Sequence, residues 1–184
     1  MSQAGAVYGQ SLYALAKDEG VEEKLLGELG LLDAAFGENP EFLKLLTSHN
    51  IPLQERLDIL EESFREKAHI YVLNFLKLLT EKGHIRQFSA CYKAYRSQYN
   101  EDRGILEVRA LSAVELREDQ KTRLAEKLAA ITGKKISLDC RVDPAVLGGV
   151  LLRYDGCQID GTVQGRLDSL SKTLKNEVSY GTET

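Results

Sequence analysis

Apolar residues recur every three to four positions through the first hundred residues of the chain, which is the period of an amphipathic α-helix. Prolines and glycines divide this pattern into short segments. The pattern predicts six helices, over residues 4–18, 21–36, 40–48, 52–64, 68–81 and 84–100. Pro40 and Pro52 suit the first turn of a helix, where the missing N–H has no partner to lose. The connections between the predicted helices are only a few residues long, which predicts a compact helical bundle over residues 1–102.

After residue 100 the period changes to two. Apolar residues alternate with polar ones over residues 106–110 and 136–142, and this alternation predicts two half-buried strands. Between them, Ser112 and Glu115 form a capping-box pattern that predicts the start of a helix. The apolar side chains of that helix are Leu116, Leu124, Leu128 and Ile131. Gly133 is expected to end it.

The last third of the chain predicts a hairpin and a final helix. Residues 149–154 and 157–160 flank an Asp-Gly pair, which suits a two-residue turn. Apolar residues then follow at helical spacing over residues 163–178, and residues 179–184 are expected to be a disordered tail. The predicted fold class is therefore α+β: a six-helix bundle, then a small α/β domain of strand, helix, strand, hairpin and helix over residues 103–178.

Composition narrows the classes of function. Apolar residues make up 43% of the chain and charged residues 28%, a balance typical of a folded globular protein. The 24 basic residues against 28 acidic ones give a net charge of -4, which argues against nucleic acid as a partner. No apolar stretch approaches the roughly 20 residues that span a bilayer. Three cysteines without C-x-x-C pairing suggest reduced thiols.

The motifs of common catalytic sites are missing from the sequence. The Gly-Lys pair at 133–134 lacks the glycine that a phosphate loop needs, no serine lies in G-x-S-x-G, and no histidines form H-E-x-x-H. The absence of these motifs therefore predicts no catalytic, cofactor or metal site. A small enzyme with a site around Asp143, Arg153 and Asp160 is an alternative that turnover of a small substrate would support.

Two helices carry more apolar surface than one core requires. The segment 4–18 is apolar around most of its circumference, and Ile70 and Leu73 fall among polar residues of the segment 69–80. One explanation is that these helices are central in the bundle. The other is a groove between them that receives an amphipathic helix from another protein, with Gly5, Gly9 and Ser11 allowing close approach.

One stretch of the chain identifies a family. Residues 142–170, VDPAVLGGVLLRYDGCQIDGTVQGRLDSL, closely resemble the signature of the delta subunit of F-type ATP synthases, called the oligomycin-sensitivity-conferring protein in mitochondria. The resemblance combines Asp143, a Gly-Gly pair before an apolar strand, the hairpin, Asp160-Gly161-Thr162 and Arg166-Leu167 in fixed order. It extends more weakly to the pattern around Tyr8 and to residues 74–85.

The resemblance implies a non-catalytic stator subunit of the peripheral stalk, which links the catalytic head to the membrane sector so that proton-driven rotation is coupled to ATP synthesis. It implies one copy per complex, no cofactor, and a peripheral position at the cytoplasmic face of the cell membrane. In that family the helical domain binds the N-terminal helix of an alpha subunit, and the C-terminal domain binds the b-subunit stalk. A helical adaptor of another assembly is the alternative, which co-purification with the synthase head would distinguish.

Carried onto this sequence, the resemblance implies two sets of contact residues. The alpha-facing groove would be lined by Tyr8, Ser11, Leu12, Leu15, Ile70, Leu73 and Lys77. The b-subunit contact would involve Arg166, Leu170 and Leu174. The sequence departs from the family pattern beside Tyr8, where Ala6 or Val7 stands in place of a basic residue and Gly9 in place of alanine.

Overall fold

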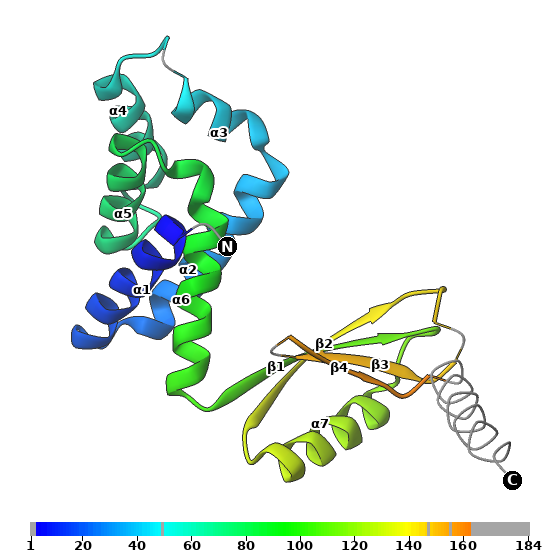
Figure 1. The fold of residues 1–184 in the computed structure, drawn as a ribbon. Helices are drawn as coiled ribbons and strands as arrows, with labels where there is room; N and C mark the ends of the chain where they lie inside the picture. The colour runs from blue at the N-terminus through cyan, green and yellow to red at the C-terminus, as the bar shows by residue number, and fades with distance from the viewer. Residues whose placement is uncertain (1–2, 49, 147, 155, 163–184) are drawn as a thin grey trace, which may run out of the picture. The chain divides into compact units, whose positions relative to one another are not determined.

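The computed structural model describes residues 3–48, 50–146, 148–154 and 156–162, and its contacts divide the chain into two units, Met1–Tyr99 and Asn100–Thr184. Seven α-helices and a four-stranded sheet are found among these residues (Figure 1). This mixture confirms the predicted α+β class.

Six α-helices and a short 3₁₀ helix occupy the described part of the first unit, and the last of them continues past the division between the units. They are α1 (Gln3–Asp18), α2 (Glu22–Glu38), α3 (Pro40–Thr47), α4 (Leu53–Phe64), α5 (Ile70–Glu81), the 3₁₀ helix η1 (Ile85–Gln87) and α6 (Phe88–Asp102). Each α-helix begins and ends within a few residues of a predicted segment, because the apolar period marks the stretches that can bury one face.

The core of this unit is built from leucines and aromatic rings of several helices. Tyr95 of α6 is completely buried, and its hydroxyl donates to the backbone oxygen of Glu22 at 2.9 Å. Tyr13 packs edge-on against Tyr95, with ring centroids 5.3 Å apart. The backbone N–H of His69, just before α5, donates to the Glu28 carboxylate at 2.6 Å. That bond satisfies one of the donors that a helix start leaves without a backbone partner.

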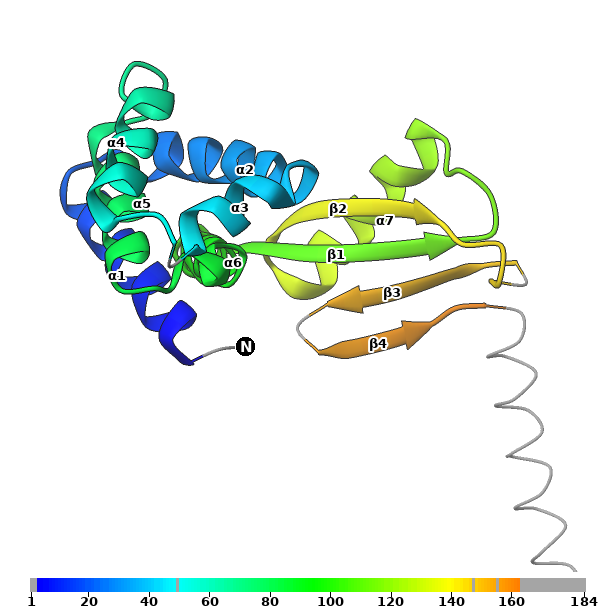
Figure 2. The same ribbon diagram turned by 90° about the horizontal axis from the view of Figure 1, so that it is seen from above.

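The second unit is a mixed sheet with one helix against it. Its elements are β1 (Ile105–Ser112), α7 (Glu118–Thr132), β2 (Lys135–Val142), β3 (Val150–Tyr154) and β4 (Cys157–Asp160). The strand order is β2-β1-β3-β4, with β1 and β2 parallel and the other two pairs antiparallel. α7 is the crossover that a parallel pair requires, and it covers one face of the sheet (Figures 1 and 2).

Alternation along β1 separates the two faces of the sheet. Leu106, Val108 and Ala110 are buried and pack with Leu128 of α7 and Leu152 of β3. The residues between them point to the opposite face and include exposed charged side chains. One face is therefore the core of the unit, and the other is polar.

Two details of α7 differ from the prediction. The helix does not start at the Ser112 capping box, because Ser112 pairs with Val150 at the end of β1. It starts after Arg117, whose backbone N–H donates to the Gln120 side chain at 3.0 Å. Ile131 is 81% exposed, so it does not belong to the apolar stripe of this helix. The pairing of Ser112 with Val150, which the local sequence pattern does not show, is the reason that the helix starts later than predicted.

The predicted hairpin is confirmed. β3 pairs with β4, and Tyr154 lies opposite Cys157, so residues 155–156 make the connection. Gly156 has φ of 76°, a conformation that suits such a turn. The final helix predicted over residues 163–178 and the tail over 179–184 lie outside the described residues.

Candidate protein-docking site

The two helices with surplus apolar residues are neighbours in the first unit. α1 lies beside α5 in both views of the ribbon (Figures 1 and 2). The ring of Tyr8 on α1 contacts that of His84, which follows α5, with centroids 5.8 Å apart. The structure therefore brings the two predicted segments together.

One exposed stripe of α1 carries an apolar residue at each end and a serine between them. Val7 is exposed, Ser11 is exposed, and Leu15 is 42% exposed, at positions i, i+4 and i+8 of one helix face. Leu12 and Tyr13, on the other side, are buried in the core of the unit. Ser11 and Leu15 are thus accessible as predicted, whereas Leu12 is not.

A similar stripe runs along α5. Ile70 is 57% exposed, Asn74 is exposed, and Leu78 is 38% exposed, again at i, i+4 and i+8. Leu73 is only 2% exposed and belongs to the core, so the prediction that it lines an open groove is wrong. Leu78 is four residues from Asn74 and eight from Ile70, so the helical period places all three on one face.

Lys77 already has a partner within the unit. Its ammonium group donates to the carboxylate of Glu61 on α4, and both side chains are about one-third exposed. Arg65 lies 3.7 Å from the same carboxylate. The positive charge of Lys77 therefore links α5 to α4, and an acidic partner would have to compete with Glu61.

The small residues of α1 serve contacts inside the unit. A Cβ atom on Gly9 would lie 2.2 Å from the backbone oxygen of Cys91 and 2.9 Å from the Cβ atom of Ala94. A Cβ atom on Gly5 would lie 2.8 Å from the Cβ atom of Ala90. These glycines let α1 approach α6, so they are not available to a docked helix. The expectation that they admit a partner is wrong.

The described signature residues of the second unit have structural roles. Gly149 has φ of 83°, and a Cβ atom there would lie 2.4 Å from the backbone oxygen of Gly161. Asp143 accepts from the backbone N–H of Ala145 at 3.0 Å, which forms the turn after β2. These contacts explain why those residue types stand at those places in the signature.

The predicted b-subunit residues are not placed by the structure. Arg166, Leu170 and Leu174 lie outside the described residues. The residues proposed for an alternative catalytic site have local partners instead. Asp160 accepts from the backbone N–H of Thr162 at 2.9 Å and from its hydroxyl at 2.6 Å. These two bonds lower the pKa of Asp160.

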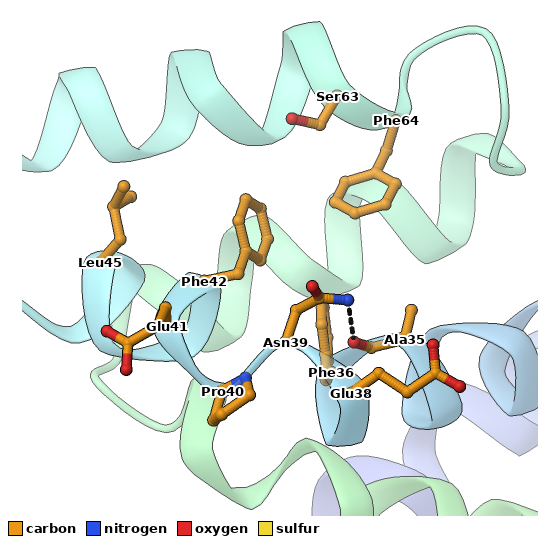
Figure 3. Close-up of a pocket in the computed structure, with 10 residues that line it drawn as sticks. All are labelled: Ala35, Phe36, Glu38, Asn39, Pro40, Glu41, Phe42, Leu45, Ser63 and Phe64. Carbon is orange, nitrogen blue, oxygen red and sulfur yellow. Dashed lines mark hydrogen bonds between the residues drawn. The ribbon is translucent and has the colours of Figure 1, made fainter.

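An apolar hollow of about 530 Å³ lies between α2, α3 and α4 (Figure 3). The rings of Phe36 and Phe42 stack with centroids 5.9 Å apart, and Phe64 meets Phe42 edge-on at 6.0 Å. In Figure 3 the rings of Phe42 and Phe64 point into the space between α3 and α4, while Glu38 and Glu41 extend outward on either side. The hollow shares no lining residue with α1 or α5.

Two buried titratable groups of the helical unit, Cys91 and Tyr95, have raised pKa values. Burial raises the pKa of the Cys91 thiol to about 11. Burial, and then the nearby Glu22 carboxylate, raise the pKa of Tyr95. No cluster of three metal-ligating side chains is found in the part of the chain that the structure describes. In the same residues, no helix combines the length and apolarity that crossing a bilayer requires.

A solved structure shares this fold. A chain of the mitochondrial ATP synthase hexamer of Toxoplasma gondii superimposes with a TM-score of 0.73 and 20% sequence identity. The match covers 92% of this chain and 96% of that one. The similarity therefore extends over both units of the sequence.

Sequence comparison identifies the family. The family described as ATP synthase delta (OSCP) subunit matches residues 5–174. The ATP synthase delta subunit of Lacticaseibacillus casei is 34% identical over 168 residues, and that of Halalkalibacterium halodurans is 30% identical over 168 residues. Each match covers 91% of this chain and 92% of the relative. The chain belongs to the ATP synthase delta (OSCP) subunit family, a stator component of the peripheral stalk, as the resemblance predicted.

Proposed function

We propose that this chain is a non-catalytic coupling subunit that holds the catalytic head of an F-type ATP synthase against rotation at the cytoplasmic face of the cell membrane. Its family membership supports the stator role. The observation that carries the mechanism is the pair of exposed apolar stripes on α1 and α5. A protein that only has to hold its partners needs binding surfaces rather than a reactive site.

The proposed partner of the two stripes is the N-terminal helix of an alpha subunit. Val7 and Leu15 on α1, with Ile70 and Leu78 on α5, offer apolar anchors that a partner helix could cover. Burying such side chains releases about 25 cal/mol for each Å² of apolar area removed from water. The four anchors are also spread over two helices, so an amphipathic helix lying between them would contact both.

The predicted contact residues divide into those on the surface and those beneath it. Tyr8, Ser11, Leu15 and Ile70 are at least partly accessible and stay in the proposal. The deeper residues Leu12 and Leu73 would shape the surface from below, and Lys77 would remain paired with Glu61.

The second unit would hold the b-subunit stalk. The proposed contact residues are Arg166, Leu170 and Leu174, which rest on the family resemblance alone. Two separate contacts suit a tether, because binding at one site raises the effective concentration at the other. One copy of the chain could thus bridge the head and the stalk, with the six helices acting as a single bundle.

Peptide binding tests the alpha contact. Ile70→Ala should weaken capture of an alpha N-terminal peptide by about 1 kcal/mol, roughly fivefold in Kd, while the unit stays folded. Leu31→Ala is the matched control, because Leu31 is an exposed leucine on α2 outside the two stripes. Isothermal titration of both variants, with circular dichroism to check folding, measures the difference.

An equal Kd for the wild type and Ile70→Ala would contradict the assignment of α5 to this contact. Leu73→Ala is a poor probe, since Leu73 is buried and its truncation would lower stability as well as binding. The stator role itself is tested by adding the protein to membranes that lack it. Failure to restore proton-driven ATP synthesis would overturn the proposed function.

A further inference from the structure

The face of the sheet opposite α7 carries three arginines, one on each of three neighbouring strands. Arg109 lies on β1, Arg141 on β2 and Arg153 on β3, and all three are exposed. In the strand register Arg109 lies opposite Asp139 on one side and directly opposite Arg153 on the other. The three guanidinium groups therefore share one surface.

The hydrogen bonds of these arginines leave the patch positive. The carboxylate of Asp139 accepts from Nε of Arg109 at 3.2 Å and from Nε of Arg141 at 3.1 Å. Nε of Arg153 donates to the neutral side chain of Gln158 at 3.1 Å. Like charges directly opposite each other destabilise a sheet pair, and the partner described for Arg153, which faces Arg109, is neutral.

The other charged groups of this face do not remove the excess. The face also carries Lys135, Glu107 and Asp160. Glu107 accepts from the side-chain amide of Asn100, and Asp160 accepts from Thr162. This local excess of positive charge stands in a chain whose net charge is -4.

An apolar pair lies beside the arginines. Leu111 on β1 faces Leu151 on β3, one row along the sheet from Arg109 and Arg153, and both leucines are half-buried. Neighbouring strands are about 4.8 Å apart, so three strands span about 10 Å, which is close to the width of an α-helix with its side chains. The surface therefore has the size and the chemistry to receive a helix.

We propose that this arginine face, made of Arg109, Arg141, Arg153, Leu111 and Leu151, docks an acidic amphipathic helix of a partner protein. Apolar side chains of that helix would cover the leucines, and its carboxylates would pair with the guanidinium groups. The negative charges of the docked helix would complement the positive charge of the face, and one of its carboxylates would lie between Arg109 and Arg153. It goes beyond the proposed function, since its five residues are on neither the α1–α5 surface nor the list of contact residues that the resemblance implies.

A designed peptide tests the proposal on the full chain. The probe is a fluorescein-labelled helical peptide of about 18 residues, with leucines along one face and glutamates flanking them. A second peptide carries lysine at every glutamate position. We expect the acidic peptide to bind at least about tenfold more tightly than the basic one, because only its charges complement the face.

Paired variants locate the binding surface. Exposed ion pairs contribute about 0.2 to 1 kcal/mol each, so the double variant Arg109→Gln/Arg153→Gln should raise the Kd of the acidic peptide about fivefold to tenfold. The matched control is Arg123→Gln/Lys127→Gln, which removes the same charge from exposed positions on α7. The control should change the Kd by less than about twofold. Thermal unfolding of both variants checks that the fold is kept.

Three results would overturn the proposal. They are equal binding of the two peptides, equal loss in the two double variants, and displacement of the peptide by inorganic phosphate at the peptide's own concentration, which would indicate a site for small anions. The alpha-peptide titration of Ile70→Ala monitors the other unit. If the acidic peptide fails to bind as expected, the proposed function still stands. If the alpha-peptide titration fails, the proposal for the arginine face still stands.

Discussion

The two units of the chain expose different kinds of surface, although each buries an ordinary apolar core. The helical unit exposes apolar residues in stripes, such as Ile70 on α5 and Leu15 on α1. The sheet face opposite α7 exposes charges, because alternation along a strand sends every second residue to one face, where Arg109 and Arg153 meet. The first surface is suited to apolar contact and the second to ion pairing. The two proposed surfaces would therefore select partners of different chemistry.

The largest expected effect is a loss of stability in the helical unit that the sheet unit does not share. Leu76→Ala removes a completely buried side chain from α5 and should lower the free energy of unfolding of the helical unit by about 2 to 5 kcal/mol. Ile131→Ala, at an exposed position of the sheet unit, should change the stability by less than about 0.5 kcal/mol. Hydrogen exchange resolved by residue measures each unit separately. An equal loss of protection in both units after Leu76→Ala would show that they share one cooperative core.

The next effect concerns the close packing of α1 against α6 in the helical unit. Gly9→Ala should destabilise the helical unit by about 1 to 3 kcal/mol, because the new methyl group would overlap the backbone of α6. Gly27→Ala is the matched control on α2, where no atom lies within 4 Å of the added Cβ atom. It should be neutral or stabilising by up to about 1 kcal/mol, since alanine favours a helix. Urea unfolding compares the pair, and equal midpoints would rule out the tight α1–α6 contact.

A smaller effect distinguishes the two proposed surfaces by salt. Raising NaCl from about 0.1 M to about 1 M shortens the Debye length from about 10 Å to about 3 Å. The acidic helical peptide should then bind the arginine face about fivefold more weakly. The alpha N-terminal peptide should change by less than about twofold, because its anchors are apolar. Fluorescence anisotropy across the salt series measures both, and parallel salt dependence would remove the chemical contrast between the units.

The smallest expected effect is a change in the pKa of one carboxyl group in the sheet unit. The two bonds from Thr162 lower the pKa of Asp160, so their stabilisation is complete above the ordinary aspartate pKa and is lost as the pH falls through the lowered value. Thr162→Val removes the hydroxyl bond and should move the pKa of Asp160 upward. Titration of the carboxyl carbon by NMR measures the shift. An unchanged pKa would mean that the hydroxyl does not hold this carboxylate.

Much of the fold could be predicted because periodicity is a local property. The helices of the first unit and the hairpin around Gly156 follow from spacing and turn chemistry alone. The start of α7 could not be predicted, because Ser112 satisfies a capping pattern locally but is held in β1 by its pairing with Val150. Pairing partners distant in sequence therefore override a signal carried by four consecutive residues.

The candidate site, too, could be predicted only in part from the sequence. The surplus of apolar residues on α1 and α5 was visible in the sequence, and Ile70 and Leu15 are indeed exposed. Which of the surplus residues remain outside could not be predicted from a single helix. Leu73 is buried because neighbouring helices close over it, and Gly9 faces α6 instead of a partner.

By itself, the sequence determined most of the described helices and strands, the family to which the chain belongs, and that apolar residues on two helices exceed what one face can bury. Only the tertiary structure decided which side of each helix is covered, that Lys77 is paired with Glu61, and that three arginines from separate strands meet on one face. The physical reason is that periodicity depends on neighbours along the chain. Burial and pairing depend instead on residues brought together by folding, and the accessible surfaces are what that packing leaves uncovered.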